Sequence, residues 1–269
     1  MQRLAVLAAL VLLPACGGST HRAPSASRAA VTAYLTRVNN TELLMQKPLR
    51  AVSTATAAFT HAHNSAATAA VLAGAQGTMD DLYARLVLVT PPAPAKRLHS
   101  LLLALVQRQA SLAGELHDLT VFNPAFSAAI QPVVAASAQA RKALRGTKKT
   151  ARVAAAIHAY RTAIEGVVVR IRHLRPPAVE RPLFEAQLTR LIALSSALAG
   201  FEHAVRTHDL TATARFQHAV SVASVSADTH ANQLAQRAAV VAYDARVSSV
   251  QALATRVQRE RDRLQATLQ

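Results

Sequence analysis

Neither glycine nor proline occurs in the last 69 residues of the chain, which follow Gly200. Because these two residues mark most turns and helix ends, so long a stretch without them favours long helices. Apolar side chains recur there at spacings of three and four, and this seam consists of Val240, Tyr243, Val247, Val250, Ala254, Val257, Leu264 and Leu268, with Arg261 in the same line. We expect a cap at Asp209, a break near Asp228-Thr229-His230, and packing of the seam on the chain's own bundle rather than in a homodimeric coiled coil.

Composition favours the same fold class for the whole chain. Hydrophobic residues make up 51% of the sequence and aromatic residues only 4%, with eight glycines and no tryptophan. Alanine, leucine and valine supply most of the apolar side chains, which suits closely packed helices better than a sheet. The sequence therefore predicts an all-α protein.

Prolines and capping residues divide the first part of the chain into helices. Ser27 is a suitable N-cap for a helix from about residue 28 to 46, which Pro48 kinks or ends before it continues to about residue 63. The following helix is expected to stop before Pro91-Pro92, because the residue before a proline is pushed out of the α region.

A heptad seam follows the double proline and predicts one face of a packed helix. It consists of Leu98, Leu102, Leu105, Gln109, Leu112, Leu116 and Leu119. Asn123-Pro124 is expected to open another helix, which Pro132 can shift downstream and which ends near Leu144, with Gly146 after it.

The two halves of the chain carry a repeated pattern. Arg85-Leu86…Thr90-Pro91-Pro92-Ala93 corresponds to Arg170-Ile171…Arg175-Pro176-Pro177-Ala178 at a shift of 85 residues. After one inserted residue, Leu98, Leu102, Leu105, Leu112 and Leu119 align with Phe184, Leu188, Leu191, Leu198 and Val205. We infer an antiparallel bundle of about seven helices built on a duplicated helix–Pro-Pro–helix hairpin. Its first helical half is 28–145 and its second is 146–269, packed as one bundle.

The start of the chain carries an export signal. Arg3 precedes an apolar run at residues 4–13, which is too short to span a bilayer as a helix. Leu13-Pro14-Ala15-Cys16 follows, and its cysteine is the only one in the sequence. This segment resembles the type II signal peptide and lipobox of bacterial lipoproteins. Pro14 departs from the small or hydroxyl residue usual at that position.

The resemblance implies where the mature protein lies. Residues 1–15 would be a signal peptide that is removed, Cys16 would carry lipid, and residues 16–27 would be a flexible tether. The protein would then be exported and anchored to the outer face of the cell membrane through lipidated Cys16. The alternatives are a plain secretory signal with an incidental cysteine, or an anchor that is not cleaved.

The chain is strongly basic, with a net charge of +16. A basic surface attracts polyanions, and those available to an exported protein are anionic lipids and envelope polymers rather than nucleic acid. The candidate polyanion-binding residues are Arg141, Lys142, Arg145, Lys148, Lys149 and Arg152. The alternative is that these charges simply solvate the surface, helped at residues 141–145 by the dipole at a helix C-terminus.

Motifs for catalysis or metal binding are not found in the sequence. No Gly-x-Ser-x-Gly, His-Glu-x-x-His, Glu-x-x-His or glycine-rich phosphate loop occurs. The acids and histidines gather best in two groups, Glu115, His117 and Asp118, and Glu202, His203, His208 and Asp209. We interpret both groups as helix ends, with Asp118 and Asp209 as N-caps, rather than as weak metal sites.

The sequence therefore favours a non-enzymatic interaction or structural protein at the membrane surface, with no cofactor or metal. It would contact anionic envelope material or a protein partner that the sequence does not identify. The alternative is a helical-bundle carrier or sensor that holds a small ligand, haem or metal between its helices.

Overall fold

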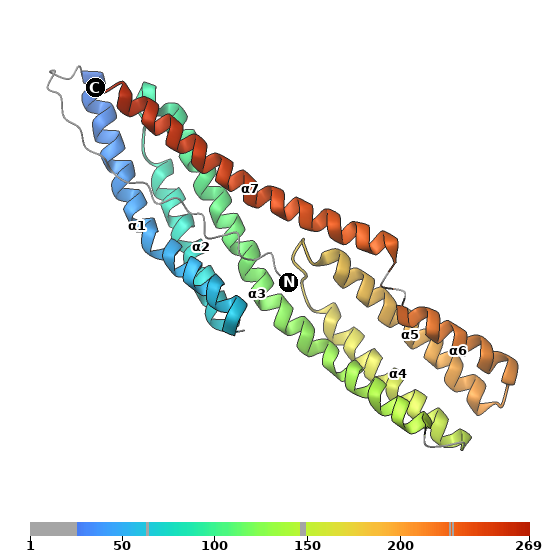
Figure 1. Ribbon diagram of the computed structural model, residues 1–269. Coiled ribbons are helices and arrows are strands. Elements are labelled where there is room, and N and C mark those ends of the chain that lie inside the picture. Colours follow the sequence, from blue (N-terminus) through green and yellow to red (C-terminus); the bar gives the residue numbers. More distant parts are fainter. Residues whose placement is uncertain (1–25, 63–64, 146–148, 226, 228) are drawn as a thin grey trace. The chain divides into compact units, whose positions relative to one another are not determined.

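The computed structural model describes residues 26–62, 65–145, 149–225, 227 and 229–269. These residues are all-α, with antiparallel helix contacts and no strand in the described ranges. The helices are α1 (Ala26–Ala62), α2 (Ser65–Val87), the short 3₁₀ helix η2 (Ala93–Ala95), α3 (Lys96–Arg145), α4 (Thr150–Arg172), α5 (Arg181–Arg206), α6 (Leu210–Val225) and α7 (His230–Ala266) (Figure 1).

The chain forms two compact units. Unit 1 contains the residues up to Val121 together with Asp244–Gln269, and unit 2 is Phe122–Tyr243. Helices α3 and α7 therefore contribute residues to both units. The division into halves at residue 146, which came from the repeat, stays a prediction.

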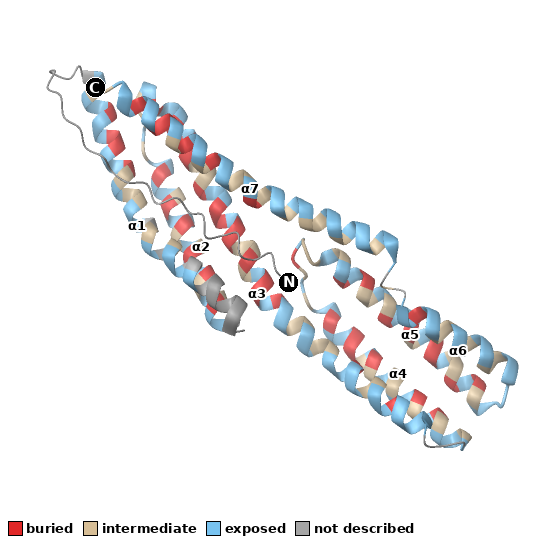
Figure 2. Ribbon diagram, viewed as in Figure 1, coloured by how far each residue is buried: buried red, intermediate tan, exposed pale blue. Residues whose placement is uncertain are grey.

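The core of unit 1 is built from the inward faces of α1, α3 and α7. Val31, Leu98 and Leu264 belong to one buried cluster, and Met79, Leu82 and Leu86 of α2 form a second with α3. Every member of the predicted seam on α3, from Leu98 to Leu119, is buried or half-buried. The spacing by three and four thus identified the packed face of this helix correctly (Figure 2).

The core of unit 2 joins the second part of α3 to α4, α5 and α6. Ile164 and Ile171 of α4 and Leu191 of α5 are fully buried in it. Phe122 and Phe126 of α3 stack with ring centroids 5.3 Å apart, and both contact Phe184 of α5. Of the residues aligned with the first seam, Phe184, Leu191 and Leu198 are buried and Leu188 and Val205 are half-buried.

The predicted helix start at Asn123-Pro124 is wrong, because α3 runs through both Pro124 and Pro132. A proline inside a helix removes one backbone hydrogen bond and crowds the preceding turn, at about 3 kcal/mol. Phe122 and Val133 are buried in the core of unit 2 on either side of Pro124, so packing can offset this cost. Helix α1 likewise runs through Pro48 without a break.

Two predictions for the end of the chain are confirmed, the cap at Asp209 and the break before α7. The backbone N–H of Ala212 donates to Oδ1 of Asp209 at 2.9 Å, so Asp209 caps α6. Helices α6 and α7 are separate, with the boundary between Val225 and His230. Val257 and Leu264 of the α7 seam are buried in the core of unit 1, so this part of the seam packs on the chain itself.

Candidate functional site

The predicted basic cluster surrounds the connection from α3 to α4. Arg141, Lys142 and Arg145 are exposed near the end of α3, Lys149 immediately precedes α4, and Arg152 is exposed in its first turn. Lys148 and the lipidation residue Cys16 lie outside the described residues. The five described members therefore all lie beside one connection, on the surface of unit 2.

Helix energetics explains only part of this cluster. Cations in the last turn of α3 are favoured because the C-terminal end of a helix carries partial negative charge. Lys149 and Arg152 lie at the beginning of α4, where the dipole disfavours cations, and the first turn of that helix contains no acid. The dipole of α4 thus gives no reason for these two charges.

The surface at the cluster is open. A shallow depression there is lined by Ala138, Arg141, Lys142 and Arg145, which are all on α3. The guanidinium of Arg141 donates to Oγ of Ser137 at 3.1 Å, one turn earlier. The positive charge of this surface is therefore presented to solvent rather than enclosed in a cavity.

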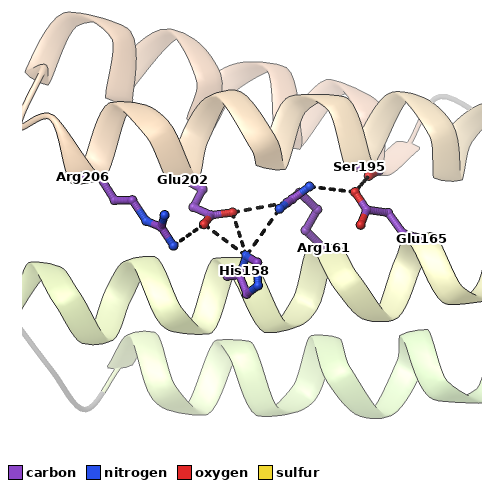
Figure 3. Close-up of polar contacts among 6 residues, drawn as sticks. All are labelled: His158, Arg161, Glu165, Ser195, Glu202 and Arg206. Carbon is purple, nitrogen blue, oxygen red and sulfur yellow. Dashed lines mark hydrogen bonds and ion pairs between the residues drawn. The ribbon is translucent and has the colours of Figure 1, made fainter.

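A second polar group, at Glu202, ties α5 to α4 (Figure 3). Glu202 is only 6% exposed, and its carboxylate lies 3.1 Å from Nδ1 of His158 and accepts from Nε of Arg161 at 3.2 Å. Arg206, one turn further along α5, contacts the same carboxylate at 2.5 Å. Arg161 also donates to Glu165 at 2.8 Å.

The charges around Glu202 keep its carboxylate ionised. Burial alone would raise its pKa, but the hydrogen bond with His158 and the charges of Arg206, His158 and Arg161 outweigh it, so the pKa of Glu202 lies below its usual range. An ionised carboxylate held by Arg161 and Arg206 and hydrogen-bonded with His158 is a poor proton donor or acceptor for a substrate. We therefore interpret this group as a structural ion network.

The sequence predicted the polar group at Glu202 only in part. It grouped Glu202 with His203, His208 and Asp209, but Glu202 is buried against α4 whereas those three residues are exposed. The partners from α4 were missed, although His158 and Arg161 are three residues apart and so share a helix face.

The proposed N-cap at Asp118 is wrong, because this residue lies in the middle of α3. Glu115 of the same sequence group accepts from Arg246 of α7 at 3.0 Å instead. This ion pair joins α3 to α7 within unit 1.

A third polar group is inside unit 1. The hydroxyl of Tyr34 on α1 lies 3.1 Å from Nδ1 of His99 on α3, and both residues are buried. Arg261 of α7 is only 6% exposed and donates to Glu42 of α1. Burial raises the pKa of Tyr34 to about 12, partly offset by Arg261 and reinforced by Glu42. Burial also lowers the pKa of His99.

Features of ligand or membrane binding are sparse in the described residues. Within these ranges no three His, Cys, Asp or Glu side chains are placed to hold a metal. Segment 93–145 is long and apolar enough to cross a membrane by composition, and 28% of its most apolar window is buried. Phe122 and Val133 of this segment belong to the core of unit 2.

Comparison with models of protein families, with curated proteins and with solved structures finds no match to this chain.

Proposed function

We propose that the protein is a lipoprotein of the bacterial cell envelope, anchored to the outer face of the membrane through lipidated Cys16. The observation that carries this proposal is the position of the only cysteine in the chain, directly after Leu13-Pro14-Ala15 and the apolar run of residues 4–13. Two or three acyl chains on one residue hold a protein durably on a membrane, because each buried CH₂ contributes about 0.8 kcal/mol.

The helical body acts as a non-enzymatic interaction protein with a basic surface. Residues 119–164 contain seven Lys and Arg and no Asp or Glu, so the basic cluster has no acid near it in the sequence. The described members of the cluster lie at the surface beside one connection, which supports contact with an extended polyanion. The depression on α3 is open, which favours this function over a carrier that encloses a ligand.

The fold is built on a duplicated hairpin. Helices α2 and α4 end 85 residues apart, at Val87 and Arg172, and α3 and α5 begin 85 residues apart, at Lys96 and Arg181. Both hairpins turn at a double proline and bury aligned apolar positions on the returning helix. These equivalences support the repeat inferred from the sequence.

The anchor is tested by blocking lipoprotein processing. Cys16→Ser should leave a precursor without lipid, because serine cannot form the thioether, and a chain that starts at Gly17 should leave the detergent phase. A globomycin-type inhibitor of the lipoprotein peptidase should make the wild-type precursor accumulate. If no precursor accumulates, Cys16 is not a processed lipidation site and the proposal is wrong.

The basic surface is tested by sedimentation with anionic vesicles at low and high salt. Each cation near such a surface contributes about 1 kcal/mol, so reversing Arg141, Lys142 and Arg145 to Glu should weaken binding by about a hundredfold or more. Reversing Arg170, Arg172 and Arg175, at the other end of α4, makes the same change in net charge and serves as the control. Equal losses in both variants would show that only net charge matters. Ligand binding that is insensitive to salt and to both sets of substitutions would favour the alternative function, a carrier that holds a small ligand between its helices.

A further inference from the structure

One end of unit 1 gathers the segments nearest to the lipidation residue. Val31 near the start of α1, Leu98 near the start of α3 and Leu264 near the end of α7 lie in one buried cluster, with Val89 of the α2–α3 connection packed against it. Figure 1 shows the chain's C-terminus beside the start of α1. We call this end, with its connection at residues 88–95, the anchor end.

Covalent geometry keeps the anchor end close to the membrane once Cys16 is lipidated. Ala26, the first residue of α1, comes ten positions after Cys16 in the sequence. A chain of that length reaches roughly 35 Å at most when fully extended. The inference that follows therefore rests on the proposed function, because the lipid is what brings this end to the bilayer.

Cations predominate at the anchor end, and the two acids near the end of α7 are held by other side chains. The exposed and half-buried cations near the ends of its helices include Arg28, Arg85, Lys96, Arg97, Arg259 and Arg263. Glu260 is 5% exposed and lies between two of them, 3.6 Å from Nε of Arg97 and 2.5 Å from Arg263. The side chains of Arg97 and Arg263 are nonetheless 71% and 57% exposed. Asp262 accepts from Gln258.

The helix dipole does not account for three of these cations. Arg28 lies in the first turn of α1, and Lys96 and Arg97 begin α3, where the helix dipole disfavours positive charge. Neither first turn contains an acid. A surface that the protein presents to an anionic partner would explain why cations occupy these positions.

Apolar side chains project from the same end. Leu88, directly after the last residue of α2, is 84% exposed, and Val87 beside it is 52% exposed. A bilayer offers both an anionic surface and an apolar phase, whereas a soluble anionic polymer offers only the charge. The combination of cations and exposed apolar side chains at the anchor end therefore fits a lipid surface better than an envelope polymer.

We propose that the anchor end of unit 1 docks on anionic phospholipid headgroups, with Leu88 inserted between the lipids and Arg28, Arg85 and Lys96 at the phosphates. The lipid on Cys16 and this surface together hold unit 1 against the membrane. A single lipid chain with a polybasic surface is a known physical route to stable attachment, and the additional acyl chains make the attachment durable.

A chain that starts at Gly17 retains every described residue and contains no cysteine, so single cysteines can be introduced for labelling. Leu88→Cys and Leu210→Cys are a matched pair, because these leucines are 84% and 83% exposed. Leu210 begins α6 at the end of unit 2 that also carries the α3–α4 connection (Figure 1). An environment-sensitive fluorophore at residue 88 should report an apolar surrounding with phosphatidylglycerol vesicles and not with phosphatidylcholine vesicles. The label at residue 210 tests whether the basic cluster docks as well.

A charge-reversal pair separates docking from folding. Arg28→Glu with Lys96→Glu places acids in two first turns, which the helix dipole favours, so the fold should hold. Binding to phosphatidylglycerol vesicles should fall by about thirtyfold or more. Arg108→Glu with Arg237→Glu changes the net charge equally at exposed positions inside helices, and it should have a much smaller effect. Leu88→Ser should lower binding by roughly tenfold, and Leu210→Ser should not.

The proposal is overturned if the label at residue 88 stays in an aqueous surrounding on anionic vesicles, or if the two charge-reversal pairs lose binding equally. A response at residue 210 alone would assign docking to the basic cluster of unit 2. These measurements use chains without lipid, so they do not depend on whether Cys16 is processed. A result that contradicts lipidation of Cys16 can therefore be distinguished from one that contradicts docking of the anchor end.

Discussion

The hydroxyl of Tyr34 lies 3.1 Å from Nδ1 of His99, and this hydrogen bond joins α1 to α3 inside unit 1. The two rings also contact each other edge to face, with centroids 6.0 Å apart. Both residues are less than one-tenth exposed, so each ring is held away from water in its neutral form. Ionisation of either ring therefore opposes folding.

Tyr34 should make the protein sensitive to alkali. The pKa of Tyr34 is raised from 10.0 to about 12 by burial, so between these values the unfolded chain loses a proton that the folded chain retains. The free energy of unfolding should therefore fall as pH rises through this range. Urea denaturation at several alkaline pH values measures the slope, which should be smaller in Tyr34→Phe. An unchanged slope in Tyr34→Phe would show that Tyr34 is not the source of the pH dependence.

Glu202 should stabilise unit 2 as an ionised group. Glu202→Gln leaves His158, Arg161 and Arg206 without their shared carboxylate. It should lower the free energy of unfolding by about 1–2 kcal/mol. The loss is smaller than for a fully buried ion pair because the side chains of Arg206 and His158 are more than half exposed. Because the pKa of Glu202 is lowered, its contribution is present above the ordinary glutamate pKa and is lost as pH falls through the folded value.

Denaturation of wild type and Glu202→Gln at neutral and acidic pH measures this contribution. The difference in unfolding free energy should be largest at neutral pH and should shrink in acid. Glu185→Gln, at an exposed position on the same helix, is the control and should change little. A difference that is constant with pH would exclude an ionic role for Glu202.

Gly200 allows close approach of α5 and α6. A Cβ at this position would lie 2.2 Å from Cε1 of Phe216, well inside van der Waals contact. Gly200→Ala should therefore destabilise the protein by about 1–3 kcal/mol, as overpacking does. Gly74→Ala in α2 meets nothing within 4 Å and should stabilise by about 0.5–1 kcal/mol. Thermal denaturation of the two variants should give opposite signs, and shifts of the same sign would contradict this packing.

The aligned leucines of the two hairpins should both contribute to stability, but unequally. Leu102 is 2% exposed, so Leu102→Ala should cost about 2–5 kcal/mol. Leu188 is half-buried against the core of unit 2, and Leu188→Ala should fall at or below the lower limit of that range. Unfolding monitored by circular dichroism measures both. A negligible effect at Leu188 would argue against the repeat.

The sequence alone determined the class of structure and the buried faces of single helices. Alternation by three and four from Leu98 to Leu119 identified the packed face of α3, and Asp209 identified the start of α6. Such signals are local: a periodic apolar stripe or a capping side chain acts within a few turns of its own helix.

Tertiary structure alone decided which helices pack together and whether a proline in the sequence ends a helix. Helix α3 continues through Pro124 because Phe122 and Val133 are buried on either side of it, although the residues around that proline favour a new helix start. Glu202 pairs with His158, 44 residues earlier, and Arg261 with Glu42, 219 residues earlier. Each pairing depends on which faces of two helices pack together. That choice is made by the free energy of burying the whole core, and no local pattern in the chain records it.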